Sequence, residues 1–136
     1  MTPIEADVQQ ASFDLPAHPA SAAEARSRTR DWLQRHPVGR DAAEAVVLVV
    51  SELVANAVTH ADGDLVSCDL HLAEGLLRIE VTDHGTGRSQ PEIRRPALDD
   101  TSGRGLLLVS TLSCAWGVIP AGLSGWTVWA TVRVTG

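Results

Sequence analysis

The chain has 136 residues and a formal net charge of −6, and hydrophobic residues make up 44% of it. This length predicts one domain with a buried core, and the acidic balance argues against a general nucleic-acid-binding protein. All 11 basic residues are arginine, because the sequence contains no lysine. This excludes sites built on a P-loop lysine, a Schiff-base lysine or the lysine of eukaryotic-type kinases. Phosphate binding would have to rest on backbone N–H groups, helix N-termini, arginine or a metal.

No apolar stretch is expected to span a membrane, and the N-terminus lacks the basic and apolar segments of a signal peptide. We therefore expect a cytoplasmic protein that makes no contact with membranes. Cys68 and Cys114 lie far apart in apolar surroundings. Their placement predicts two buried free thiols instead of a disulfide or a metal site.

The polar residues 1–11 predict a flexible start, and residues 12–136 predict a single domain. Ser12–Leu15 alternates polar and apolar side chains and is followed by a proline. This pattern is typical of a short strand at the edge of a sheet.

The next element is an expected helix over Ser21–His36, whose start resembles a capping box formed by Ser21 and Glu24. The helix carries three arginines at alternate positions. They are either solvated charges or side chains that face a partner or a phosphate, and the sequence leaves both open. The predicted buried stripe of this helix consists of Ala25, Thr29, Trp32 and Leu33.

The longest uninterrupted element is an expected helix over Asp41–Ala61, with Asp41 as its cap. Valine, leucine and alanine form a broad apolar face, while Glu52, Asn56 and His60 follow one another at four-residue intervals on the other face. This polar row either meets water or points into a cleft. In a cleft, the carboxylate can act as a general base and the amide oxygen can ligate Mg²⁺.

Two strands are expected over Leu65–Leu72 and Leu76–Thr82, because both alternate apolar and polar residues and a short loop joins them. Their alternation predicts an antiparallel sheet with one face covered. Asp83, Gly85 and Gly87 follow directly. Glycines after an aspartate at a strand end let the backbone pass close to a bound group, although an Asx turn with a flexible loop fits the same residues.

A second glycine pair stands at the start of an apolar helix that is expected over Arg104–Leu112. The pair either brings free N–H groups of the helix N-terminus to an anion or permits tight packing of the helix on the sheet. The last strands are expected over Ser113–Ile119 and Trp126–Val134. Together the elements predict an α/β (α+β) fold, a two-layer sandwich in which helices cover one face of a mixed, mostly antiparallel sheet.

Three motifs stand in order along the chain: Glu52-x3-Asn56-x3-His60, Asp83-x-Gly85-x-Gly87, and Gly103-Arg104-Gly105-Leu106. Together they resemble the GHKL-type (Bergerat) ATP-binding fold, which is shared by DNA gyrase B, Hsp90, two-component histidine kinases and MutL. The branch that looks most similar contains the anti-sigma-factor serine kinases of Gram-positive bacteria and their actinobacterial ATP-binding relatives. The resemblance covers nearly the whole chain.

The resemblance implies a role for each matching residue. Glu52 matches the catalytic carboxylate of the family, Asn56 matches its Mg²⁺-ligating amide, and His60 matches a position near the phosphates. Asp83 matches the aspartate that binds the exocyclic amine of adenine. The other residues that the resemblance places around the nucleotide are Gly85, Gly87, Gly103, Arg104, Gly105, Leu106 and Thr127.

The resemblance also implies an activity that depends on ATP and Mg²⁺. The first hypothesis is an anti-sigma factor and serine/threonine kinase that sequesters a sigma factor and phosphorylates a STAS-type anti-anti-sigma protein. The family further implies a homodimer, formed through Ser12–Leu15 and the N-terminal helix. The alternatives are a nucleotide-dependent regulatory binding module without phosphotransfer activity, and simple ATP hydrolysis.

The sequence departs from the family pattern after the first glycine box. Family kinases often carry a further acidic residue there, whereas this chain continues with Arg88-Ser-Gln-Pro91. That difference favours the binding module, while Glu52 favours the kinase because a pure binder needs no base. The chain also lacks the histidine-containing helix pair of a complete sensor histidine kinase, which excludes that class.

Overall fold

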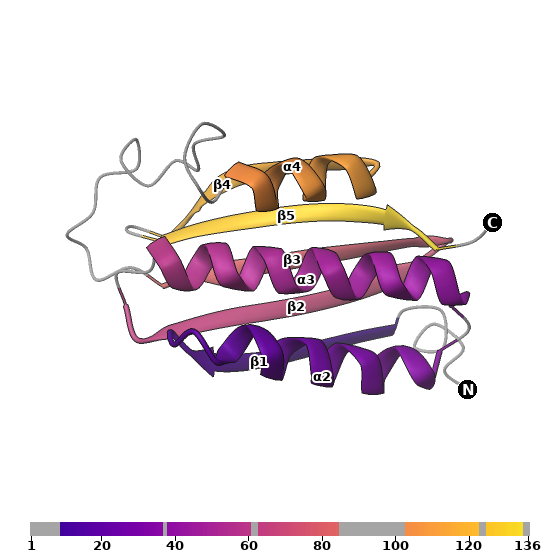
Figure 1. Ribbon diagram of the computed structural model, residues 1–136, viewed down its shortest axis with the longest axis horizontal. Coiled ribbons are helices and arrows are strands. Elements are labelled where there is room, and N and C mark those ends of the chain that lie inside the picture. Colours follow the sequence, from indigo (N-terminus) through magenta and orange to yellow (C-terminus); the bar gives the residue numbers. More distant parts are fainter. Residues whose placement is uncertain (1–8, 37, 61–62, 85–102, 123–124, 135–136) are drawn as a thin grey trace.

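The computed structural model describes residues 9–36, 38–60, 63–84, 103–122 and 125–134, with the backbone alone for residues 103–106. The strands and helices of this part of the chain form two layers (Figure 1). In chain order they are β1 (Gln9–Pro16), α2 (Ser21–Gln34), α3 (Arg40–His60), β2 (Leu65–Ala73), β3 (Leu76–Asp83), α4 (Gly103–Leu112), β4 (Ala115–Ala121) and β5 (Gly125–Arg133).

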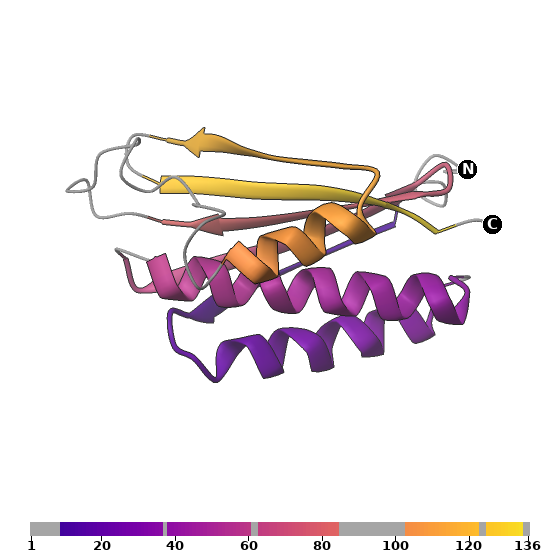
Figure 2. The same cartoon turned by 45° about the horizontal axis from the view of Figure 1, so that its top comes forward.

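The described strands form one sheet with the spatial order β1-β2-β3-β5-β4. Figure 2 shows α2, α3 and α4 together on one face of this sheet, which confirms the predicted two-layer sandwich. The expectation of a mixed sheet needs a correction, because every pairing among the described strands is antiparallel. Two helices separate β1 from β2, so the chain enters β2 at Leu65, opposite the residue where β1 ends, Pro16.

The core lies between the sheet and the helices. Side chains point into it from every second residue of a strand and from one face of α3, where residues recur about every 3.6 positions. Alternate residues of β2, β3 and β5 point towards the helices and are buried. On the helix side, α3 contributes the most buried side chains. The fully buried side chains of largest volume are Leu53, Leu70, Leu77, Ile79, Val46, Val49, Val50, Val54, Val66, Val81 and Val109.

By length and composition alone, α3 is apolar enough to cross a membrane, contrary to the expectation that no stretch qualifies. In the structure, however, α3 packs against β3 and β5, and its valines and leucines fill the core. This is how the central helix of a globular domain uses its apolar side chains.

The N-terminal boundaries differ from the expected ones. Gln9, Gln10 and Ala11 belong to β1 instead of the expected flexible segment, because they pair with the end of β2. Residues 1–8 lie outside the described residues. The predicted capping box is wrong, since the Ser21 hydroxyl donates to the Pro16 carbonyl at 2.6 Å. The predicted buried stripe of α2 is confirmed in full.

Two further boundaries shift by one or two residues. Arg40 is the first residue of α3, so Asp41 lies in the first turn of the helix instead of capping it. The amide of Ser113 donates to the Val109 carbonyl at 3.0 Å, which extends the bonding pattern of α4. The strand β4 therefore begins at Ala115 instead of Ser113.

The two cysteines are free thiols that differ in exposure. Cys68 is fully buried on β2, where burial and the nearby charge of Asp69 raise the pKa of its thiol from 9.0 to about 12. Cys114 is exposed, which corrects the expectation of two buried thiols. The apolar residues that follow Cys114 belong to an edge strand, so they do not bury it.

We expect iodoacetamide at about pH 8 to alkylate Cys114 and to spare Cys68 in the folded protein, because only a thiolate attacks the reagent. Intact-mass spectrometry should show one adduct on the folded protein and two after unfolding in guanidinium chloride. The variant Cys114→Ser should remain unmodified while folded. Rapid double labelling of the folded wild type would contradict the burial of Cys68.

Candidate functional site

A small cavity lies between the C-terminal turns of α3 and the adjoining strands β3, β5 and β4. The register of the sheet explains which strand residues line this cavity. Asp83 pairs with Trp126, and Val81 pairs with Val128, so these four side chains share the face that points towards α3. The residues that line the cavity are Asn56, Ala57, His60, Val81, Asp83, Val118, Trp126 and Val128.

Two polar side chains in this cavity are almost completely buried. Asn56 is 7% exposed and Asp83 is 3% exposed. The Oδ1 atom of Asn56 accepts no hydrogen bond from any residue that the structure describes. Leaving such an atom unsatisfied costs about 1–3 kcal/mol, so this oxygen is suited to a ligand or a cation. The side chain of Asn56 therefore lies at this cavity and not in solvent.

The remaining walls are apolar, and a few polar groups among apolar walls are typical of small-molecule sites. The cavity has a volume of about 20 Å³, which is enough for about one water molecule. An adenine ring is larger, so its entry would require the walls to move apart. The polar groups and apolar walls suit the chemistry of a nucleotide base, and any base that entered would have to widen the cavity.

The cavity brings together three of the residues that the sequence singled out, Asn56, His60 and Asp83. Glu52 lies one turn earlier on α3 and is partly exposed, and it is not among the residues that line the cavity. Glu52, Asn56 and His60 lie on α3, and Asp83 lies at the end of β3. These are the elements on which the sequence located the two motifs.

Thr127 lies on the other side of the sheet. Its hydroxyl oxygen is 2.8 Å from that of Thr82, and the two share a hydrogen bond on the uncovered face. Because side chains alternate along a strand, Thr127 points away from the face that carries Trp126 and Val128. The structure therefore does not bring Thr127 together with Asp83.

The two glycine motifs are described only in part. Gly85 and Gly87 lie outside the described residues. Gly103, Arg104, Gly105 and Leu106 form the first turn of α4, and their side chains lie outside the description. The amino end of α4 lies at the same end of the molecule as the carboxyl ends of α3 and β3 (Figure 1). The free N–H groups of its first turn thus belong to the same region as the cavity.

Sequence reasoning missed the apolar walls of the cavity. Trp126 could have been found, because the alternation along β5 groups it with Val128, and Val81 stands two residues before Asp83. Val118 could not have been found in this way, because its position depends on the pairing of β4 with β5.

Within the described residues, no group of three or more His, Cys, Asp or Glu side chains could hold a metal ion. A cation at this site would thus combine the Asn56 oxygen with oxygens of the bound ligand and water. Mg²⁺ is suited to such a site, because it retains several waters and binds readily to phosphate oxygens.

Comparison with known proteins shows a family and a similar fold. The model of the histidine kinase-like ATPase domain family matches residues 15–129. A similar solved structure is that of the RsbU and RsbW domains of Rv1364c from Mycobacterium tuberculosis, with a TM-score of 0.71 and 24% sequence identity. The alignment covers 93% of this chain and 32% of that chain, so this chain spans about a third of the compared structure. Among curated proteins, no sequence matches this chain.

Proposed function

Because the chain belongs to the histidine kinase-like ATPase domain family, we propose that it is an ATP-binding anti-sigma factor and serine/threonine protein kinase. In this proposal it sequesters a sigma factor and phosphorylates a STAS-type anti-anti-sigma protein. One observation carries the nucleotide part of the proposal. The Oδ1 atom of Asn56, which accepts no hydrogen bond from the described residues, lies in an apolar-walled cavity that also contains the buried carboxylate of Asp83.

The proposed binding mode assigns a different part of the nucleotide to each group. The carboxylate of Asp83 accepts a charge-assisted hydrogen bond from the exocyclic amine of adenine. Val81 and Val128 contact the ring face. The Oδ1 atom of Asn56 would hold Mg²⁺, and the bound ion would neutralise charge on the phosphates. The N–H groups at the start of α4 and the ring of His60 are directed to the phosphates.

The proposed transfer uses Glu52 as the general base. A serine or threonine hydroxyl oxygen of the partner forms a bond to the terminal phosphorus of ATP, the bond from that phosphorus to ADP breaks, and Glu52 accepts the hydroxyl proton. Partial exposure of Glu52 supports this role, because a hydroxyl on another protein must reach the carboxylate. Positioning and charge neutralisation by the binding residues supply the rest of the catalysis.

The identity of the partners rests on the motifs that resemble anti-sigma-factor serine kinases. The likeness of fold to a structure that contains an RsbW domain supports this part of the proposal. A homodimer formed through β1 and α2, and a cytoplasmic location, belong to the same proposal.

A second candidate is a nucleotide-dependent regulatory module that binds its partner without phosphotransfer. One observation favours it, because Glu52 is not among the residues that line the cavity. The two candidates share the nucleotide site and differ in whether Glu52 acts on a partner's hydroxyl group. They can therefore be separated by a substitution at Glu52.

We expect Glu52→Gln to lower phosphotransfer by about 100-fold or more and to leave ATP affinity almost unchanged, because it removes the base and keeps the side-chain size. The measurement uses γ-labelled ATP, Mg²⁺ and candidate STAS proteins, with calorimetric ATP binding alongside. The matched control is Asp41→Asn, an exposed carboxylate about three turns earlier on α3 that lines neither the cavity nor the groove between α2 and α3. Transfer that survives Glu52→Gln at the wild-type rate would exclude Glu52 as the base. ATP binding without any transfer by the wild type would favour the regulatory module.

A further inference from the structure

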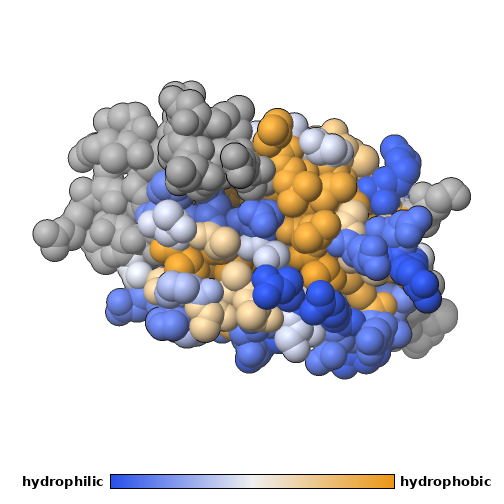
Figure 3. Space-filling model, in the orientation of Figure 1, coloured by the Kyte–Doolittle hydropathy of each residue, from blue (hydrophilic) through white to orange (hydrophobic). Residues whose placement is uncertain are grey.

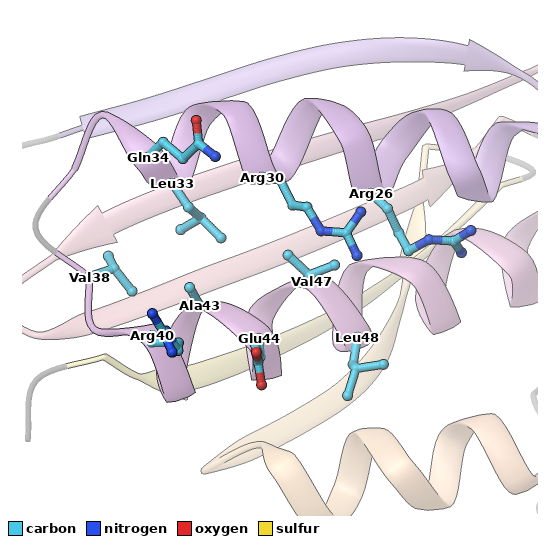
Figure 4. Close-up of a pocket in the computed structure, with 10 residues that line it drawn as sticks. All are labelled: Arg26, Arg30, Leu33, Gln34, Val38, Arg40, Ala43, Glu44, Val47 and Leu48. Atoms are coloured by element: carbon cyan, nitrogen blue, oxygen red, sulfur yellow. The ribbon is translucent and has the colours of Figure 1, made fainter.

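A groove of about 510 Å³ lies between α2 and α3 on the helix layer. It uses the first half of α3 and shares no residue with the cavity at Asn56. Leu48, on the groove, and Asn56 are about 12 Å apart along the helix axis at 1.5 Å per residue. Figure 4 shows the residues that line it, which are Arg26, Arg30, Leu33, Gln34, Val38, Arg40, Ala43, Glu44, Val47 and Leu48.

The charged groups of this groove are mostly positive, although the chain is acidic overall. Arginines from both helices lie on its rim, and Glu44 is the one acidic residue in its lining. Arg26 donates to the Ser51 hydroxyl oxygen at 2.8 Å. Neither Arg30 nor Arg40 forms an ion pair with another residue that the structure describes. Two guanidinium groups at this groove are therefore available to carboxylates of another molecule.

The floor of the groove is apolar and partly open to solvent. Leu33 and Val47 are buried beneath it, whereas Leu48 is 44% exposed. In Figure 3 an apolar surface crosses α4 and the middle of α3, and hydrophilic side chains border it on the side of α2. An exposed apolar surface with a polar rim is typical of a protein-binding site.

We propose that this groove binds an acidic peptide segment of a partner protein that carries large apolar side chains. The apolar side chains of the segment lie on Leu48 and Val47, and its carboxylates pair with Arg30 and Arg40. A small anion alone does not account for the groove, because it would leave the apolar floor exposed. This inference stands apart from the proposed phosphotransfer, since the groove and the cavity have no residue in common.

The test uses a fluorescein-labelled helical peptide in which leucine recurs every third or fourth position and Asp and Glu fill the other positions. Its twin carries Lys in place of the acidic residues. Fluorescence anisotropy should show binding of the acidic peptide and little binding of the basic twin. The double variant Arg30→Glu/Arg40→Glu should weaken binding of the acidic peptide by about tenfold or more and should gain affinity for the basic twin.

Two further variants separate the groove from general charge effects. Arg35→Glu reverses an exposed charge that follows α2 but does not line the groove, and it should retain wild-type binding. Leu48→Ser should weaken binding of the acidic peptide and should not give binding of the basic twin. The double variant should keep the ATP affinity of the wild type, which distinguishes failure of this inference from failure of the proposed nucleotide site.

Several outcomes would overturn the inference. One is equal loss of binding in Arg35→Glu and in the double variant, and another is no binding of the acidic peptide by the wild type. Binding that appears only after residues 1–8 are removed would assign the groove to the chain's own first residues. Self-association that the double variant abolishes, without peptide binding, would assign it to a second copy of the chain.

Discussion

Replacing Asp83 with asparagine is expected to weaken ATP binding by about 10- to 100-fold. The substitution preserves the size of a side chain that is 3% exposed, but it removes the charge that would strengthen the proposed hydrogen bond from the adenine amine. A hydrogen bond to a charged group contributes about 1.5–3 kcal/mol, and 1.4 kcal/mol corresponds to a tenfold change in affinity. Isothermal titration calorimetry with ATP and Mg²⁺ measures the loss directly.

The same substitution should change the preference for the base. Inosine triphosphate carries an oxygen in place of the exocyclic amine, so the wild type should bind it poorly, whereas Asp83→Asn can donate its amide N–H to that oxygen. The matched control is Asp69→Asn on β2, where the carboxylate accepts a hydrogen bond from Ser12. Equal ATP affinities for wild type and Asp83→Asn would show that Asp83 does not contact the base.

Replacing Leu53 with alanine is expected to lower the free energy of unfolding by about 2–5 kcal/mol. Leu53 is completely buried at the centre of α3, so the shorter side chain loses its contacts and leaves a cavity. The matched control is Leu48→Ala on the same helix, where the side chain is 44% exposed. It should cost less than about 1 kcal/mol.

Urea unfolding followed by circular dichroism tests this pair of variants. The midpoint should fall strongly for Leu53→Ala and little for Leu48→Ala, at an unchanged dependence on urea concentration. Similar midpoints for the two variants would contradict the orientation of α3, because they would mean that both faces of the helix are equally buried.

The sequence predicted the elements of this fold because their periodicities are strong. The four-residue spacing on α3 and the alternation along β2, β3 and β5 are visible in the chain itself. The direction of strand pairing was harder to predict. For β1 and β2 it depends on the end of the sheet to which α2 and α3, the two helices between these strands, bring the chain. The capping contacts at helix starts also escaped prediction, although the starts themselves lie within one residue of the expected positions. The hydroxyl of Ser21 bonds back to Pro16, and no local pattern distinguishes that contact from a cap.

The site was predictable where one element carries the information. Asn56 and His60 follow from the helical spacing, and Asp83 follows from its position at the end of a strand. Burial of the Asn56 oxygen was not predictable, because a polar row facing water has the same spacing. For Thr127 the resemblance predicted a place beside the nucleotide that the structure does not give it. The alternation of side chains along β5 turns Thr127 to the face of the sheet that the helices leave uncovered.

The position of β5 has a consequence for synthesis of the protein. Among the described strands β5 comes last in chain order, yet it lies inside the sheet between β3 and β4 and supplies one wall of the cavity. As the chain leaves the ribosome, β1, β2 and β3 can pair early, while the edge of β3 has no native neighbour until Gly125–Arg133 has emerged. The cavity therefore cannot form until β5 has been synthesised, and the nascent chain exposes an open β3 edge in the interval.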